Sequence, residues 1–213
     1  MGIFDLVLIL TFLFTVISLL RFLYLLIRGR RVKAFGTVKH LAIFLATYFA
    51  VLVVVSLASP QRVLPMGQDE CFDDWCVSVD NAKTVSNIGS GSTAATANGN
   101  FYVLQLKVSS RARRISQRAP DGVVYILDGK GNRYEVSEAG QRAYEAANGA
   151  TLPIDSLLGP SSSFTTVRVF DLPKDVTDPG LVVQHGIGPG RFVIGDSSSF
   201  FHKRTVISLK SQS

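Results

Sequence analysis

The chain contains few of the residues that build metal sites and catalytic centres. Its 213 residues include two cysteines, Cys71 and Cys76, and three histidines, His40, His185 and His202. The cysteines have the spacing C-x4-C without a second pair, and the histidines show no ligand spacing, so no zinc site is expected. No G-x-S-x-G, H-E-x-x-H or P-loop motif occurs. The sequence therefore predicts neither an enzyme nor a bound cofactor.

The C-terminal part of the chain also lacks an excess of charge of either sign. Residues 1–59 carry six Lys or Arg and one acid, Asp5, whereas the remaining residues carry 16 basic and 15 acidic side chains. The formal net charge of +6 thus arises almost entirely beside the apolar N-terminal segments. A broad basic field, such as nucleic-acid binding requires, is not indicated, and we expect no nucleic-acid partner.

Two apolar stretches near the N-terminus are long enough to cross a membrane. Residues 41–58 contain no charge, and 18 residues at 1.5 Å each span most of a bilayer core of about 30 Å. Residues 3–27 lack Pro and Gly and carry only two charges, Asp5 and Arg21. Tyr24 and Tyr48 are expected near membrane interfaces. We predict that residues 1–59 form a two-helix transmembrane hairpin that anchors the protein in the membrane.

The loop expected between these helices, residues 28–40, is basic and contains no acid. Short loops rich in Lys and Arg stay in the cytoplasm. This places the protein in the cell membrane with its C-terminal domain outside the cytoplasm. Binding of anionic lipid head groups is an alternative role for the same residues. The topology-setting residues are Arg28, Arg30, Arg31, Lys33 and Lys39.

Cleavage of the second apolar segment is the alternative to a permanent anchor. Ser56, Leu57 and Ala58 resemble the small-x-small pattern of a signal cleavage site, although the apolar stretch is long for a signal.

Residues 60–70 then form a polar linker, and residues 71–213 are expected to fold as one extracytoplasmic domain.

Cys71 and Cys76 are predicted to form a disulfide, because an even number of cysteines in an extracytoplasmic domain favours pairing. Two free thiols are the alternative. The enclosed loop is short, so the expected stabilisation is about 2 kcal/mol. Trp75, beside the second cysteine, is expected to pack in the core.

From Trp75 onward the pattern is that of short strands separated by Gly, Pro, Ser and Asp. Residues 86–100, rich in Gly, Ser, Ala and Asn, are expected to form a loop, and residues 137–149 a helix capped by Ser137 and ended by Gly149. This predicts a mainly β fold, an antiparallel immunoglobulin-like sandwich with a short helical insertion. The expected strands are 75–79, 101–110, 123–128, 133–137, 163–173, 181–186, 191–195 and 204–209.

Two sequence stretches carry a resemblance to a known family. They are the 128–134 turn of LDGKGNRYEV, and residues 170–175 before the strand at 181–183, within SSFTTVRVFDLPKDVTDPGLVV. Over roughly residues 75–210 the chain resembles bacterial immunoglobulin-like domains of unknown function, grouped with the immunoprotective extracellular immunoglobulin-like superfamily. The resemblance implies the sandwich fold and no catalytic role. Many such domains look like lipoproteins or follow one membrane segment, whereas this chain has two apolar segments and no lipidation cysteine.

Together these features predict a membrane-anchored, non-catalytic binding or assembly module of the cell envelope, whose partner is an envelope protein or surface ligand. An arginine cluster between two expected strands is either a solvated loop or the contact to anionic lipid or a partner. It consists of Arg111, Arg113, Arg114 and Arg118.

Two other functions remain open. One is an envelope enzyme or chaperone-like factor whose site is built from residues distant in sequence. The other is an accessory subunit of a membrane transporter, which would be indicated by polar residues facing other helices. The relevant residues are Thr11, Thr15, Arg21 and Thr47.

Overall fold

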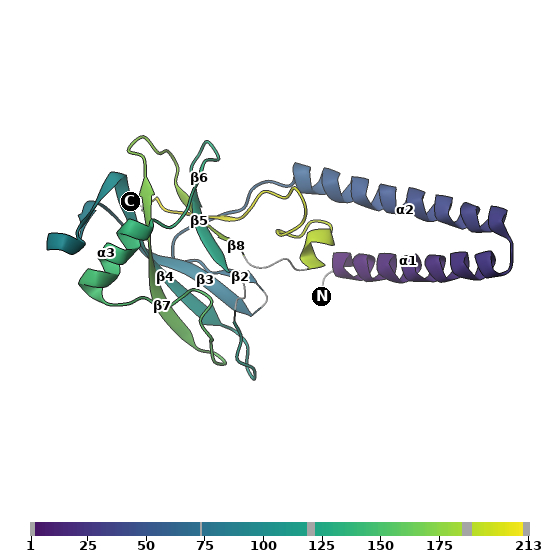
Figure 1. Cartoon of the computed structure of the whole chain (residues 1–213), viewed down its shortest axis with the longest axis horizontal. Coiled ribbons are helices and arrows are strands. Elements are labelled where there is room, and N and C mark those ends of the chain that lie inside the picture. The colour runs from purple at the N-terminus through teal and green to yellow at the C-terminus, as the bar shows by residue number, and fades with distance from the viewer. Residues whose placement is uncertain (1–2, 73, 119–121, 185–188, 211–213) are drawn as a thin grey trace. The chain divides into compact units, whose positions relative to one another are not determined.

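The computed structural model describes residues 3–72, 74–118, 122–184 and 189–210. His185 lies outside these ranges. The chain divides into two compact units, and each is described by itself. The first unit comprises Met1–Gln61 and Ile187–Arg204, and the second Arg62–Gly186 and Thr205–Ser213. Figure 1 shows helices in the first unit and sheets in the second.

The first unit contains an antiparallel pair of helices, α1 (Ile3–Ile27) and α2 (Arg31–Ala58) (Figure 1). By length and composition, both are able to cross a membrane. The loop predicted at residues 28–40 is wrong in its extent, because the turn occupies only residues 28–30. Residues 31–40 continue α2 instead, since they contain no proline and their single Gly36 does not end a helix. Arg31, Lys33 and Lys39 are thus helical residues.

A regular seam joins the two helices. Buried residues recur at every seventh position, the repeat of helices that pack side by side. They are Thr11, Ser18 and Leu25 on α1, and Ala34, Leu41 and Tyr48 on α2.

Small and polar residues suit such a seam inside a membrane because they allow close approach of the backbones. The Thr15 hydroxyl, on the same side of α1 as Thr11, donates to the Thr11 carbonyl at 2.8 Å. Arg21 and Thr47, by contrast, are exposed on the hairpin. Thr11 and Ser18 of α1 are therefore buried against the rest of the chain itself.

The second unit is a sandwich of two sheets. One sheet has the order β1-β9-β8-β5-β6 and the other β2-β3-β4-β7. All strand pairs are antiparallel except β1 with β9, which is parallel. The strands are β1 (Val63–Leu64), β2 (Glu70–Phe72), β3 (Trp75–Ile88), β4 (Ala95–Ser110), β5 (Val123–Leu127), β6 (Arg133–Tyr134), β7 (Ser163–Leu172), β8 (Gly180–Gln184) and β9 (Val206–Ser208).

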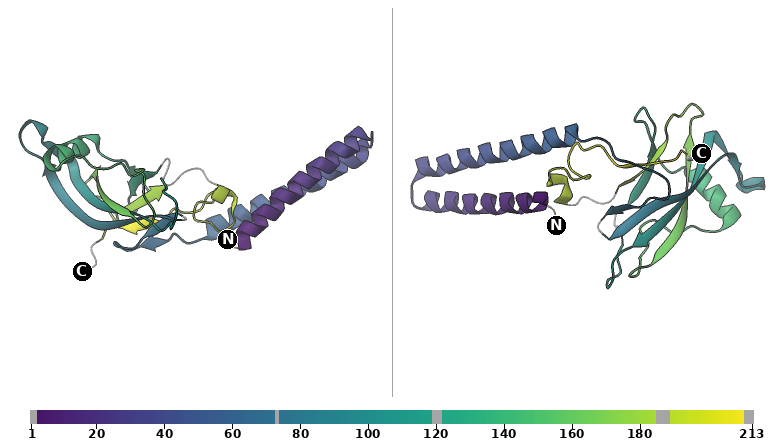
Figure 2. Two further views of the ribbon diagram at one scale, coloured as in Figure 1. Left: turned by 90° about the horizontal axis from the view of Figure 1, so that it is seen from below. Right: turned by 180° about the vertical axis from the view of Figure 1, so that it is seen from behind.

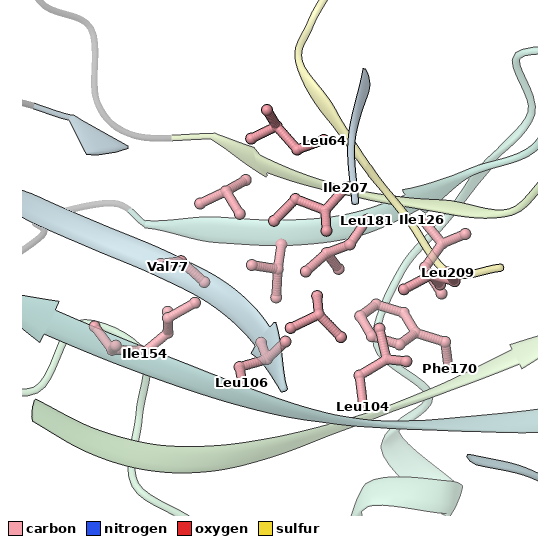
Figure 3. Packing of buried hydrophobic residues seen from close by; sticks show 14 of the residues in the cluster. Leu64, Val77, Leu104, Leu106, Ile126, Ile154, Phe170, Leu181, Ile207 and Leu209 are labelled. Atoms are coloured by element: carbon pink, nitrogen blue, oxygen red, sulfur yellow. The ribbon is translucent and has the colours of Figure 1, made fainter. Parts of the chain in front are cut away.

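A single hydrophobic core lies between these sheets. Leu104, Leu106 and Phe170 come from one sheet, and they pack with Ile126 and Leu181 from the other (Figure 3). These five side chains are fully buried. Trp75 belongs to the same core, as expected from the sequence. Burial of large aliphatic and aromatic side chains stabilises the sandwich by about 1.5–3 kcal/mol per side chain.

The loop predicted at residues 86–100 is largely a strand pair. β3 extends to Ile88 and β4 begins at Ala95, with a short 3-10 turn at Gly91–Thr93 between them. Small residues have weak strand propensity, but cross-strand pairing overrides it here, because Asn87 and Ile88 pair with Thr96 and Ala95.

Helix α3 (Glu138–Asn148) agrees with the predicted insertion. The Ser137 hydroxyl accepts a hydrogen bond from the Gly140 N–H, and Gly149 ends the helix with a φ of 95°. The helix covers the outer face of β4 and β7, where Ala143 packs with Phe101 and Val169 (Figure 1).

The strand predicted at residues 191–195 is wrong. Pro189–Phe192 forms a short 3-10 helix, η2, and turns follow it. The segment lies beside the helical hairpin (Figure 2). Ile194 joins Tyr48 and Leu52 in a hydrophobic cluster. An apolar Phe-Val-Ile run satisfies either environment, so periodicity alone does not distinguish them.

Candidate functional site

A disulfide closes the hairpin of β2 and β3. Cys71 and Cys76 stand directly opposite each other in the register, and their sulfur atoms are 2.11 Å apart. The predicted pairing is confirmed. Cys76 is fully buried, whereas Cys71 is half-buried. The disulfide therefore fixes the start of the sheet while one half of it lies close to the surface.

Beside this disulfide lies a polar groove with a volume of about 650 Å³. Three cationic side chains line it: Arg62 before β1, Lys107 on β4, and Arg111 just after β4. Asp69 and Cys71 contribute from the start of the β2 hairpin. We refer to it as the basic groove. It brings together residues 62–71 and residues 107–111, which are distant in the sequence.

The charges of the basic groove are only partly balanced. Arg111 forms an ion pair with Asp69 at 2.9 Å, and the two side chains are 60% and 34% exposed. An exposed pair of this kind contributes only about 0–1 kcal/mol to stability. Asp69 is the one carboxylate among the described lining residues, so cationic groups outnumber it. Such a surface attracts anions and holds them by charge-assisted hydrogen bonds.

The predicted arginine cluster is divided by the fold. Arg111 lines the basic groove, whereas Arg113, Arg114 and Arg118 are exposed outside its described lining. Backbone hydrogen bonds hold the loop in place, including Arg111 N–H to the Asp74 carbonyl at 2.7 Å and Gln117 N–H to the Leu158 carbonyl at 2.9 Å. The three outer arginines are thus presented on a tethered segment.

A second basic surface lies at the tip of the helical hairpin. A hollow of about 390 Å³ is lined there by Gly29, Arg30, Arg31, Val32 and Lys33. Among the topology-setting residues, three thus lie together at this turn. Arg28 also lies at the tip, where its guanidinium stacks over the Tyr24 ring at 5.1 Å. The fifth, Lys39, lies further along α2.

Asp69 is also close to both cysteines. The potential metal-ligating atoms of Asp69, Cys71 and Cys76 lie within 4.8 Å of one another. Both sulfur atoms are, however, used by the disulfide, and metal binding requires the thiolate. In the oxidised protein this group therefore offers one carboxylate and no thiolate ligand.

The 128–134 turn is organised by one buried carboxylate. Asp128 accepts hydrogen bonds from the N–H groups of Lys130 and Asn132, at 2.9 and 2.8 Å, and from the Asn132 side chain and the Tyr134 hydroxyl. Burial acts to raise the pKa of the Asp128 carboxyl, but these hydrogen bonds together hold it below its usual range. The turn residues that carry the family resemblance therefore have a structural role.

Sequence reasoning missed most of the groove. Lys107 lies on a strand whose alternation reveals only which residues face the core, and Arg62 belongs to the predicted linker. Lys107 comes close to residues 67–71 because β2 and β4 both pair with β3, which no local pattern encodes. Among the lining residues, the sequence indicates Arg111, by its place in a dense arginine cluster, and Cys71, as half of the predicted disulfide.

No family model matches the chain, and no curated protein matches it. Solved structures offer remote likenesses. A conserved hypothetical protein from Bacillus anthracis is 17% identical, with a TM-score of 0.44 over 56% of this chain and 89% of its own. An uncharacterised β-sandwich protein from Clostridium difficile 630 is 12% identical, with a TM-score of 0.42 over 71% and 96%. The secreted protein MPT63 from Mycobacterium tuberculosis is 11% identical, with a TM-score of 0.45 over 72% and 100%.

Proposed function

We propose that this chain is a non-catalytic binding module of the cell envelope, anchored by its helical hairpin and binding an anionic ligand in the basic groove. The observation that carries the proposal is the clustering of Arg62, Lys107 and Arg111 around one carboxylate beside the disulfide. The ligand is a protein segment or surface polymer that bears carboxylate or phosphate groups.

The location outside the cytoplasm forms part of the same proposal. Its support is the density of cations at the hairpin tip, since such turns remain in the cytoplasm and direct both helix ends to the other side. The disulfide is also consistent with an oxidising compartment. In this arrangement α2 is a permanent anchor, not a cleaved signal.

An immunoglobulin-like plan is the fold that we assign to the sandwich. Its support is that β4 and β5 lie in different sheets, as do β6 and β7, so the chain crosses repeatedly between sheets. The domain differs from antibody domains in its disulfide, which closes a hairpin within one sheet. Arg113, Arg114 and Arg118 extend the cationic surface available to a partner.

Binding of simple polyanions to the full chain tests this function. The protein would be placed in nanodiscs of neutral phosphatidylcholine and titrated with fluorescent hexaglutamate and, separately, with a short polyphosphate. We expect at least one probe to bind, with an affinity that falls as salt is raised. Replacing Lys107→Ala should weaken binding roughly tenfold, because one charge-assisted hydrogen bond contributes about 1.4 kcal/mol or more.

The control is Arg142→Ala, which removes an exposed cation from α3 and should leave binding unchanged. The two probes separate a carboxylate-bearing protein partner from a phosphate-bearing polymer. Failure of both probes to bind the unaltered chain, or equal binding by Lys107→Ala, would overturn the proposal.

A further inference from the structure

Residues 189–204 lie between the neighbouring strands β8 and β9 in the sequence, yet they belong to the helical unit. The Tyr48 hydroxyl donates to the Phe192 carbonyl at 2.5 Å, although the two residues are 144 positions apart. The hydroxyls of Ser56 and Ser199 meet at 3.0 Å in a buried position. These contacts join the segment to α2 at two different levels.

The positions of these two contacts show how far the segment extends along α2 from the end of the helix at Ala58. Ser56 is close to the end of α2 at Ala58, whereas Tyr48 precedes that end by about 15 Å at 1.5 Å per residue. A bilayer core of about 30 Å places Tyr48 near its middle. In this placement the Tyr48 hydroxyl, predicted to lie near an interface, is deep in the bilayer and donates to the Phe192 carbonyl.

The backbone of the segment is suited to an apolar surrounding. Non-helical backbone at membrane depth requires its polar groups to be satisfied within the protein. Successive turns provide this, through hydrogen bonds from Val193 N–H to the Gly190 carbonyl, from Ser199 N–H to the Asp196 carbonyl, and from Phe200 N–H to the Arg191 carbonyl.

The segment carries four charged residues, Arg191, Asp196, Lys203 and Arg204, of which Asp196 lies near the end of α2. The Asp196 carboxylate accepts from the Ser198 N–H and hydroxyl, next to the Ser199 contact with Ser56. Arg191 is bonded through its carbonyl to Phe200, and its guanidinium lies over the Phe200 ring at 5.9 Å. The Asp196 carboxylate is therefore at the level of the α2 terminus, where head groups can solvate it.

The outward surface of the segment is aromatic. Phe192, Phe200 and Phe201 are 42%, 36% and 67% exposed, and the rings of Phe192 and Phe200 pack together with centroids 5.3 Å apart, so the exposed aromatic surface is contiguous. Phe192 packs edge-on against Phe49 of α2, itself exposed, so the aromatic surface continues the apolar surface of the helix. Figure 2 shows the segment beside the helix ends in both views.

We propose that residues 189–204 form a re-entrant element that inserts Phe192, Phe200 and Phe201 into the acyl chains of the membrane leaflet on the domain side. The partner of this surface is lipid. This inference rests on the proposed membrane anchoring of the hairpin. The element attaches the sandwich to the bilayer through a second connection, far in sequence from the linker that follows α2.

Spin-label accessibility tests this insertion in the full chain. Both native cysteines are in the disulfide, so a single new cysteine is labelled selectively. The chain would be reconstituted in phosphatidylcholine and phosphatidylglycerol vesicles with labels at Phe201→Cys, Phe200→Cys, Ile43→Cys or Leu157→Cys. Ile43 is 56% exposed on α2, and Leu157 is 63% exposed on the sandwich. The measured quantity is the ratio of collision rates with oxygen and with a polar nickel complex.

We expect the ratio at positions 200 and 201 to be roughly tenfold higher than at position 157, because hydrocarbon excludes the polar complex. It should approach the ratio at position 43. Water-like ratios at 200 and 201, with a lipid-like ratio at 43, would overturn the insertion and leave the anchor intact. A water-like ratio at 43 as well would overturn the anchoring and the insertion together.

Discussion

Single polar side chains fix several local structures in the sandwich. The Asp128 carboxylate accepts hydrogen bonds from backbone N–H groups of its own turn. The Glu145 carboxylate accepts hydrogen bonds from the Thr151 hydroxyl and the Gln141 side chain. Hydrogen bonds from Thr151 and Gln141 hold the pKa of the Glu145 carboxyl below its usual range. For both residues the ionised carboxylate is the form that the fold prefers, and the free energy of unfolding consequently depends on pH.

Acid should therefore destabilise the sandwich in a defined range. A carboxyl whose pKa is lowered by folding stabilises the protein above its unfolded pKa, and that contribution is lost as the pH falls through the lower folded value. We expect the free energy of unfolding to decline below about pH 4.5, the ordinary pKa of Glu145. In Asp128→Asn the protein should be less stable at pH 7 and should show a shallower decline. Urea unfolding followed by Trp75 fluorescence measures both. If the free energy of unfolding of the variant declined as steeply with falling pH as that of the unaltered protein, the proposed contribution of ionised Asp128 would be contradicted.

At the scale of elements, helix α3 depends on the absence of a side chain. A Cβ atom at Gly140 would lie 2.7 Å from Val169 Cγ1 and 2.9 Å from Phe101 Cε1. Both neighbours are fully buried, so neither is able to move away easily. Gly140 thus permits the close approach of α3 to the sheet, which explains a glycine inside a helix despite its low propensity.

Gly140→Ala should accordingly lower stability. Overpacking costs roughly 1–3 kcal/mol, and the better helix propensity of alanine returns at most about 1 kcal/mol. We expect a net loss of free energy of unfolding, measured by urea titration of the full chain in micelles. Arg142→Ala on the exposed side of α3 should change stability by less than about 0.5 kcal/mol. A Gly140→Ala protein as stable as the unaltered chain would show that the helix shifts freely.

The elements that sequence could predict were those with local signals. Ser137 and Gly149 mark the ends of α3, and the Gly-Lys-Gly-Asn turn marks the hairpin of β5 and β6. The extension of β3 and β4 and the docking of residues 189–204 had no such signal. The extension of β3 and β4 depends on pairing with a partner strand. Residues 189–204 carry apolar side chains that could be buried either on a helix surface or in a sheet, and the sequence does not show which.

At the scale of the whole molecule, the composition of the sequence predicted the apolar helices. It did not predict which residues from distant parts of the sequence lie together in space. Two long apolar runs sufficed to predict the helices, because hydrophobic length is a property of contiguous sequence. The basic groove is lined by Arg62, Lys107 and Arg111. Because Arg62 is far from the other two in the sequence, nothing in the sequence shows that the three cations lie together. The pairing of the strands determines which of these residues lie close together. That pairing depends on the packing of the whole hydrophobic core.

Orientation in the membrane is a prediction about the entire chain. Replacing Arg28, Arg30, Arg31 and Lys33 by Gln would remove four of the five cations that we propose hold the hairpin tip in the cytoplasm. In intact spheroplasts, added protease should release the sandwich of the unaltered protein, as followed by blotting. In the variant, a substantial fraction of the sandwich should become protected, because its tip no longer opposes translocation.

The matched control removes cations of the same kind from the sandwich. Arg111, Arg113 and Arg114 replaced by Gln should leave protease release unchanged, since residues far from a membrane segment contribute little to orientation. Protection of the unaltered sandwich from protease would invert the proposed topology. Release from all three proteins alike would mean that the hairpin tip does not set the orientation, and that some other feature of the helices directs the sandwich outward.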